Sequence, residues 1–380
     1  MLLWRTTVPD LHLPDLDPHR YFSVHVLRRT ADFDGFLRYE WVAATVVQLA
    51  ALVVLALLGR RIAGGFELGR VGTGVMVGAV VTTVLWLVGL PFGFLELWWQ
   101  RRYGLSREGY GAWLVGQWPA VTAQVVGLTI LLTILLLIAG WLRRYWWAVA
   151  VPVVVGLGTL VTFVLPLLMT LGTEPVHDRA LAADIRDLER KEGVTGTPVR
   201  VEKVSDRTRA INAESVGFGP TKRVFLWNTL LSGRLSRDEV RVVAAHELGH
   251  TKRKHILRGV GWSLLFSVPL LFLTAEVTRR RGGLALPENV PLALLTLGVL
   301  GLALTPLVNA ISRRYEAEAD WVALQTTHDP GSARGLFRAF SSADLTQPDP
   351  PTWSYVMVDD HPTTMQRIAM TVAWERRSRP

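Results

Sequence analysis

Residues 236–257 read SRDEVRVVAAHELGHTKRKHIL, and this stretch decides how the rest of the chain is interpreted. It opens with Ser236 followed three residues later by a glutamate, which is the capping-box pattern that starts a helix. On that helix His246 and His250 are four residues apart, so both imidazoles project from one face and can bind one metal ion. The spacing therefore predicts a helix that carries two metal ligands.

Glu247 follows the first of these histidines and completes the pattern H-E-x-x-H. In this pattern the glutamate is not a ligand but takes a proton from the water that the metal activates. The chain contains only nine histidines among 380 residues, so a chance match is expected about 0.01 times. Two solvent-facing helix histidines are therefore the weaker interpretation, and Glu247 is the candidate general base.

The third ligand must be sought elsewhere in the chain, because a catalytic zinc usually has three protein ligands and one open position for water. Cysteine is absent, so the ligands are His, Asp or Glu. Residues 309–324, NAISRRYEAEADWVAL, place Glu316, Glu318 and Asp320 on one short helix. Glu316 and Asp320 share a face of this helix, whereas Glu318 points away. Glu316 is the candidate third ligand, and Glu318 is expected on a solvated acidic face.

Long apolar runs surround these polar segments. Half of the residues are hydrophobic, and the mean hydropathy is +0.28. Six runs are each long enough to cross a bilayer as a helix, and tryptophans lie near several of their ends, as at a membrane interface. We therefore expect a mainly α membrane protein with about six transmembrane helices, because six buried helices of a soluble protein would need more polar sequence to enclose them. The runs are 41–58, 71–95, 113–140, 146–171, 259–277 and 290–311.

The polar stretches suggest a catalytic domain in two parts. The sequence HDRALAADIRDLERKEG is typical of an amphipathic helix, and PVRVEKV, INAESVG and KRVFLWN are typical of short strands. We expect an inserted α+β unit of zincin type that carries the H-E-x-x-H helix, and a helical C-terminal segment. The predicted organisation is an N-terminal polar or amphipathic segment (1–40), a membrane region of about four helices (41–171), the first part of the catalytic domain (172–258), a membrane hairpin (259–311) and its C-terminal part (312–380).

The distribution of charge indicates an orientation. The chain has a net charge of +9, with Lys and Arg clustered where apolar runs end, which favours a membrane surface over nucleic acid as the partner. Basic residues are more numerous in 1–40, 96–112 and 172–258 than in the loops predicted on the opposite side. Since basic loops stay in the cytoplasm, we expect a multi-pass protein of the cell membrane whose catalytic part faces the cytoplasm. The first forty residues lack the pattern of a removable signal peptide.

These motifs resemble the M48 zinc metallopeptidases and, within that family, the Ste24-type CAAX prenyl proteases. AAHELGHTKRKH resembles the family's HELGH helix, including a further histidine, His255. SRRYEAEAD resembles its R-x-x-E-x-x-A-D segment, which implies Glu316 as third ligand and Asp320 as a residue that orients a ligand histidine. His255 is expected to support the site without binding the metal, because a fourth protein ligand would close the water position.

Three further segments extend the resemblance. INAESVGFGPTKRVFLWNTLL resembles the family's Asn-Ala strand, which implies that Asn212 and Ala213 lie along the substrate cleft. DDHPTTMQRI resembles its distal His-Pro segment, which implies that His361 stabilises the oxyanion, although the residues alone favour an ordinary histidine at the start of a helix. LPFGFLELWWQRRYGLSREGYGAWL resembles the segment after an early membrane helix of Ste24-type enzymes.

We therefore expect a zinc-dependent membrane metalloendopeptidase that binds one Zn²⁺ per chain and resembles Ste24-type CAAX proteases. Its partners would be the lipid bilayer and protein or peptide substrates, including membrane-associated or lipidated proteins, but not nucleic acid. A membrane-protein quality-control protease without CAAX specificity fits the same residues. An intramembrane site-2-type protease is disfavoured because charged residues flank the motif. A non-catalytic metal-binding membrane scaffold differs from all of these in not needing Glu247.

Overall fold

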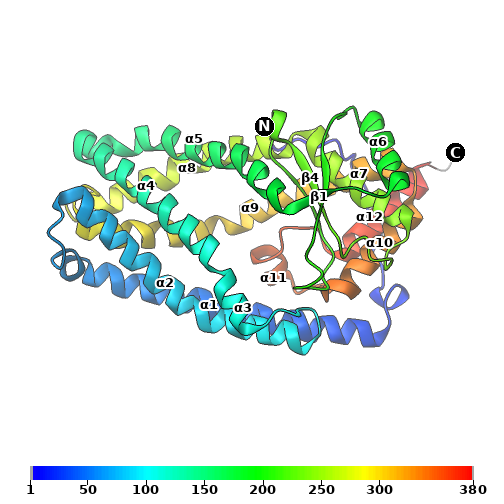
Figure 1. Ribbon diagram of the computed structural model, residues 1–380, viewed down its shortest axis with the longest axis horizontal. Helices are drawn as coiled ribbons and strands as arrows, with labels where there is room; N and C mark the ends of the chain where they lie inside the picture. Colours follow the sequence, from blue (N-terminus) through cyan, green and yellow to red (C-terminus); the bar gives the residue numbers. More distant parts are fainter. Residues whose placement is uncertain (1–2, 379–380) are drawn as a thin grey trace.

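The structure, a computed structural model, describes residues 3–378 of the chain. Long apolar helices form an elongated bundle, and a polar part with a small sheet lies at one end of it (Figure 1). Six helices make up the bundle: α1 (Val24–Ala63), α2 (Gly69–Arg102), α4 (Trp118–Leu142), α5 (Trp146–Met169), α8 (His255–Arg279) and α9 (Val290–Thr327).

The bundle has the length and composition of a membrane domain. Five segments of the described residues are long and apolar enough to cross a membrane, and one of these, Tyr110–Gly172, contains both α4 and α5. Large apolar side chains are exposed along the bundle, as expected where lipid and not water is the solvent, for example Val46, Leu57, Leu160 and Leu265. The predicted mainly α membrane fold with about six spanning helices is confirmed.

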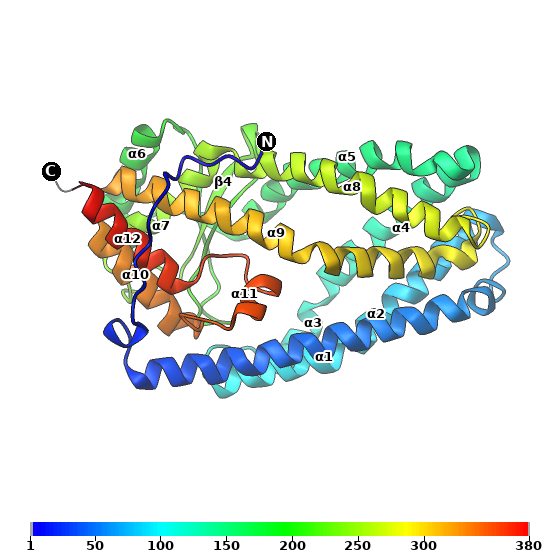
Figure 2. The same cartoon turned by 180° about the vertical axis from the view of Figure 1, so that it is seen from behind.

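α1 extends well beyond the hydrocarbon core. It has 40 residues, so it is about 60 Å long, which is twice the thickness of that core. Ser23 caps its first turn by accepting a hydrogen bond from the Val26 amide. The N-terminal half of α1 therefore continues past the bundle and runs along the polar part (Figure 2). The segment 1–40 that the sequence predicts as polar thus contains the first turns of this helix.

The polar part is built on a four-stranded sheet with the order β1-β2-β4-β3. β3 is the last strand in this order and so lies at an edge; β2 and β4 are parallel, and the other neighbours are antiparallel. Val224, Phe225 and Leu226 of β4 are fully buried in the core. The strands are β1 (Thr173–Pro175), β2 (Val199–Glu202), β3 (Ala213–Val216) and β4 (Arg223–Trp227).

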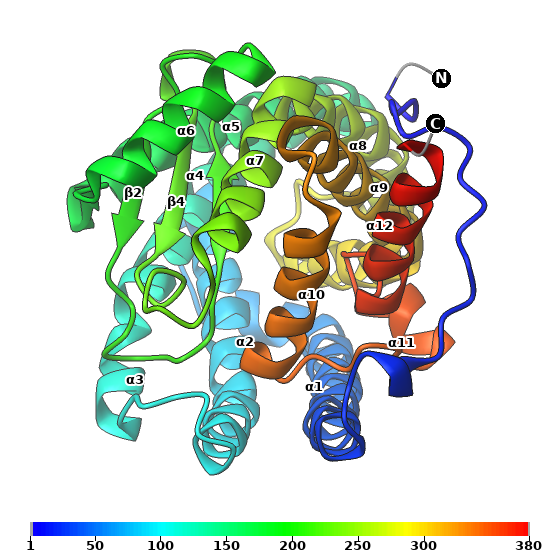
Figure 3. The same cartoon turned by 90° about the vertical axis from the view of Figure 1, so that its right-hand side faces the viewer.

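Helices cover this sheet and connect it to the bundle. The predicted capping box is present at Ser236, directly before α7 (Arg237–Arg253) begins. α7 ends in a left-handed residue, Lys254, and α8 starts directly after it. α8 and α9 then form a hairpin that leaves the polar part and returns to it (Figure 2), and α9 packs along α7 (Figure 3). The remaining helices of the polar part are α6 (Arg179–Glu192), α7 (Arg237–Arg253), α10 (Pro330–Asp344), α11 (Thr352–Met357) and α12 (Thr364–Ser378).

Candidate metal centre

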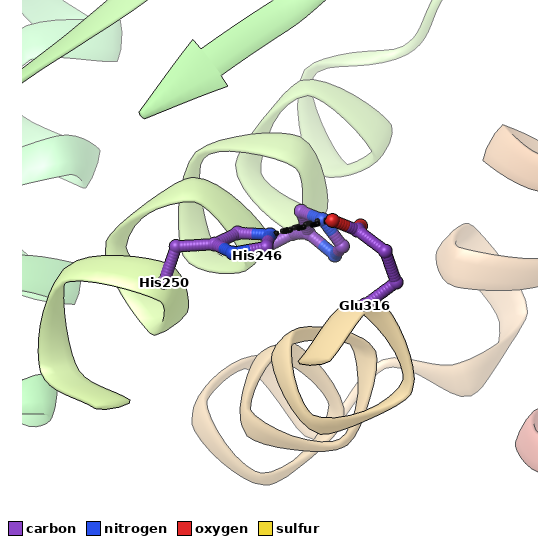
Figure 4. Close-up of side chains that lie close together, drawn as sticks. All are labelled: His246, His250 and Glu316. Carbon is purple, nitrogen blue, oxygen red and sulfur yellow. Dashed lines mark hydrogen bonds and ion pairs between the residues drawn. The ribbon is translucent and has the colours of Figure 1, made fainter. Parts of the chain in front are cut away.

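Three side chains from α7 and α9 converge on one point (Figure 4). The Nε2 atoms of His246 and His250 are 3.1 Å apart, and Nε2 of His246 is 3.1 Å from Oε2 of Glu316. Nε2 of His250 is 3.5 Å from Oε1 of the same carboxylate. His246 and Glu316 are buried, so the donor atoms face one another and not bulk solvent.

The spacing of these atoms fits a zinc ion. Zinc binds His nitrogen and carboxylate oxygen at about 2.0–2.2 Å in a tetrahedral arrangement, which places neighbouring donor atoms about 3.4 Å apart. The separations of 3.1 to 3.5 Å agree with that value. The donor set of two imidazoles and one carboxylate is also one that catalytic zinc sites use, with a position left for water.

Asp320 orients His246 through a hydrogen bond to the ring nitrogen that faces away from the other two side chains. Its Oδ1 lies 2.8 Å from Nδ1 of His246, so the ring proton lies on Nδ1 and the Nε2 lone pair faces the other donors. Arg367 of α12 donates two hydrogen bonds to the same carboxylate, at 2.7 and 2.8 Å. Arg367 lies within the segment DDHPTTMQRI, but the sequence did not link it to Asp320, which is 47 residues away.

His255 contacts His250, the second histidine of the three converging side chains. Its Nδ1 is 2.9 Å from Nδ1 of His250, and its Nε2 is 3.0 Å from Oε2 of Glu318. The expectation that Glu318 lies on a solvated acidic face is wrong, since its side chain is completely buried. Helical periodicity correctly directed Glu318 away from Glu316, but the start of α8 and the N-terminal residues cover that face.

The other predicted residues line one cavity of about 480 Å³ beside the ligands. Its wall includes His246, Glu247, Asn212, Ala213 and His361. The structure therefore brings together residues from α7, the approach to β3 and the segment before α12. Asp34 of α1 and Asp344 of α10 also line the cavity, and no sequence motif had singled them out.

Comparisons with known proteins agree with this arrangement. The profile of Peptidase family M48 matches residues 175–375, which is more than half of the chain. The chain belongs to peptidase family M48. The matched residues include all three converging side chains and the cavity wall formed by Asn212 and His361.

Individual relatives place this M48 chain near the Ste24-type members. The uncharacterized metalloprotease YhfN of Bacillus subtilis (strain 168) is 28% identical over 76% of this chain and 71% of its own length. CAAX prenyl protease 1 of Saccharomyces cerevisiae is 25% identical, over 51% of this chain and 44% of its own length. The crystal structure of S. mikatae Ste24p superposes with a TM-score of 0.78, covering 96% of this chain and 92% of that one at 20% identity, which shows a shared fold.

The predicted resemblance is thus confirmed. Family membership and the apolar helices together support an integral-membrane metalloprotease with peptide or protein substrates.

The M48 site attracts positive charge. Burial alone would lower the pKa of His246, but its contacts with the carboxylates of Asp320 and Glu316 raise it well above its usual value. A cation is therefore stabilised between these side chains, and a divalent metal ion meets this requirement more fully than a single proton.

Glu247 and His361 have pKa values shifted toward the roles that the sequence predicts for them. Burial raises the pKa of the Glu247 carboxyl, although the nearby histidines partly oppose the shift. Partial burial would lower the pKa of His361, but its hydrogen bond with Asp360 and the charge of Glu316 raise it. Nε2 of His361 lies 3.3 Å from Oε2 of Glu316, so this ring reaches the edge of the metal centre.

Proposed function

We propose that the chain is a zinc-dependent membrane endopeptidase in which His246, His250 and Glu316 hold one Zn²⁺ and Glu247 is the general base. The convergence of these three side chains beside a cavity whose wall includes His246 and Glu247 supports the proposal most strongly. When bound, the zinc would polarise the scissile carbonyl and lower the pKa of the attacking water toward ~7.

Glu247 moves the proton in this proposal. Its carboxylate takes a proton from the attacking water and passes it to the amine that leaves the cleaved bond. A general base works best when its pKa is close to the working pH, and burial shifts the pKa of Glu247 in that direction. The helix that carries Glu247 is packed between the sheet and α9, which fixes its position relative to the ligands.

His361 is proposed to donate a hydrogen bond to the oxyanion that forms on the substrate carbonyl. Its Nδ1 lies 2.7 Å from Oδ1 of Asp360, which orients the ring and leaves Nε2 directed at the metal centre. The raised pKa of His361 favours the form that carries a proton on Nε2. A donor already in place where charge develops lowers the barrier because it needs no reorganisation.

The substrate is proposed to bind in extended form beside Asn212 and Ala213. β3 begins at Ala213 and pairs on one side with β4, so its other edge has unpaired backbone groups within the described residues. A peptide can pair with such an edge through its main chain. This mode presents a scissile bond without requiring a particular sequence.

We further propose that the substrates are membrane-associated proteins, including lipidated ones, and that the cleft faces the cytoplasm. Relatives described as CAAX prenyl proteases support a lipidated substrate, and the distribution of basic residues supports the orientation. The relative that matches the greater part of the chain is described only as a metalloprotease. Turnover of membrane proteins without CAAX specificity therefore remains the second candidate.

Replacing the ligands tests the metal site. His246→Ala and Glu316→Ala are expected to lose bound zinc and proteolysis together, because each removes one of three ligands. His177→Ala and Glu174→Ala are matched controls, since both side chains are 75% exposed and lie outside the site. Zinc is measured by elemental analysis of the purified chain, and stoichiometric zinc in Glu316→Ala would remove that residue from the proposed ligand set.

A further inference from the structure

The carboxylate of Glu318 is buried among five hydrogen-bond contacts. Its Oε1 accepts from the backbone N–H and the hydroxyl of Thr7, at 2.7 and 2.8 Å, and from Nε of Arg253 at 2.8 Å. Its Oε2 accepts from Nη1 of Arg258 at 2.8 Å and lies 3.0 Å from Nε2 of His255. Arginine and the backbone amide can only donate, so Glu318 acts solely as an acceptor here.

This arrangement sets the direction of a hydrogen-bond chain toward the metal centre. His250 presents a lone pair on Nε2 to a metal only if its ring proton lies on Nδ1. That proton then faces Nδ1 of His255, 2.9 Å away, which must accept it. His255 consequently carries its own proton on Nε2 and donates it to Glu318. A group that accepts at the position of Glu318 is therefore compatible with metal binding by His250, whereas a donor there would reverse the chain.

The N-terminal residues complete the surroundings of Glu318. Residues 3–8 cross the outer side of α9, as seen in Figures 2 and 3. The hydroxyl of Tyr315 donates to the Leu3 carbonyl at 2.7 Å, and the guanidinium groups of Arg258 and Arg314 donate to the carbonyls of Arg5 and Trp4. These contacts fix Thr7, which supplies two of the donors to Glu318.

We propose that Glu318 is a positioning residue of the metal centre, which acts through His255 on His250 and is itself held in place by Thr7 of the N-terminal segment. The two ligand histidines are then oriented by two carboxylates of the same helix, His246 directly by Asp320 and His250 through one intervening imidazole. This inference rests on the proposed zinc site, since it concerns the orientation of one of the ligands.

Metal affinity separates a positioning role from a merely structural one. The test uses the full-length chain in detergent, with the dissociation constant for Zn²⁺ measured by competition with a chromogenic chelator. The Co²⁺-substituted chain gives a second readout, because its visible spectrum depends on ligand geometry. Glu318→Gln keeps the size of the side chain but removes its charge. We expect a 10- to 100-fold weaker affinity, typical of losing a partner of a ligand histidine, and an altered cobalt spectrum.

Thr7→Val is the second variant, because a buried carboxylate between two arginines is a severe place for a substitution. This variant removes the hydroxyl donor of Thr7, keeps its backbone N–H and leaves Glu318 intact. Thr6→Val, at the neighbouring position, is the matched control. We expect the zinc affinity of Thr7→Val to be several-fold weaker than that of Thr6→Val. Thr6 makes no hydrogen bond to Glu318 in the described residues. If Glu318→Gln does not fold, Thr7→Val alone decides.

Two results would overturn the proposal: a folded Glu318→Gln with the zinc affinity and cobalt spectrum of the unmodified chain, or equal affinities for Thr7→Val and Thr6→Val. Failure of the underlying zinc site would look different. In that case the unmodified chain itself would not bind zinc stoichiometrically, or His250→Ala would bind it as tightly.

Discussion

Glu318 and Asp320 are two residues apart on α9, yet both face polar partners in the interior. Residues two positions apart in an α-helix are separated by about 200° of rotation, so these carboxylates leave α9 on nearly opposite sides. Asp320 points to His246 and Arg367, and Glu318 points to His255 and the N-terminal residues. In the proposed site, one helix therefore supplies Glu316 and two carboxylates, of which Asp320 contacts His246 directly and Glu318 contacts His250 through His255.

His361 offers a test of transition-state stabilisation. If it donates to the oxyanion, His361→Ala should keep zinc and KM but lower kcat by about a hundredfold or more, which is the usual loss for one such donor. If it only starts α12, the change would lower stability by about 1 kcal/mol and leave kcat nearly intact. Measuring kcat, KM and bound zinc on one purified variant distinguishes the two roles. An unchanged kcat would exclude the donor role.

Glu192 at the end of α6 makes stability depend on pH. The residue is only 4% exposed, and burial raises the pKa of its carboxyl from 4.5 to about 8, despite the opposing charge of Lys252. The folded chain thus holds a proton that the unfolded chain releases. Because the folded state binds more protons, stability contributed by this group is present below about pH 4.5 and is lost as pH rises to about 8.

Glu192→Gln should remove this dependence. The melting temperature of the variant minus that of the unmodified chain is expected to be higher at pH 9 than at pH 5. The change corresponds to at most a few kcal/mol of stability. Thermal unfolding in detergent at both pH values measures the effect, with the exposed Glu174→Gln as control. A difference that is the same at both pH values would contradict the assignment.

The residues of the site differ in how far sequence could locate them. Helical spacing related His246, Glu247 and His250 within one motif, and the resemblance to a known family linked Glu316 in a second motif to them. Thr7 lies in no motif, and the segment DDHPTTMQRI did not mark Arg367, because only the packing of the N-terminal residues and α12 against α9 brings these two side chains close to the site. The prediction that Glu318 is solvated was wrong for the same reason. Helical periodicity gives the direction of a side chain but not the residues that cover it.

The lengths of the apolar runs predicted the membrane-spanning parts of the helices but not the polar parts that extend from them. The runs 41–58 and 290–311 correspond to parts of α1 and α9, which are 40 and 38 residues long. Their polar extensions have no hydrophobic signal to mark them. The extension of α9 is nevertheless the part that carries Glu316, so the continuity of one helix from the bundle to the candidate metal centre positions the proposed third ligand.

Gly59 of α1 is a test of how the bundle packs. A Cβ atom at this position would lie 2.2 Å from the backbone oxygen of Glu288, which cannot rotate away. Gly59→Ala is therefore expected to destabilise the chain by about 1–3 kcal/mol. Gly35→Ala in the same helix is the matched control, since nothing lies within 4 Å of its Cβ, and it should be neutral or slightly stabilising. Equal melting temperatures for the two variants would show that α1 does not pack this closely there.

The whole molecule has its polar part at one end of the bundle and the loop between α1 and α2 at the other (Figure 1). A membrane around the apolar helices would therefore place the metal centre on one side and residues 64–68 on the opposite side. The excess of basic residues near the polar part predicts that this side is the cytoplasm.

Cysteine labelling tests this orientation, because the chain has no native cysteine. Arg190→Cys and Arg338→Cys lie on exposed positions of the polar part, and Glu67→Cys lies in the loop at the far end. In intact cells a membrane-impermeant maleimide should label only Glu67→Cys, and permeabilisation should expose the other two. Labelling of Arg190→Cys and Arg338→Cys from outside would reverse the orientation, and opposite results for these two would refute a shared side.

Glu247→Gln tests the proposed mechanism most directly, since it separates the chemical step from metal binding within one side chain. The variant keeps His246, His250 and Glu316, so zinc should remain near one per chain, while loss of the base should slow cleavage of an unfolded protein by at least about a hundredfold. Cleavage at an undiminished rate with zinc retained would show that Glu247 is not the base and that the proposed mechanism is wrong.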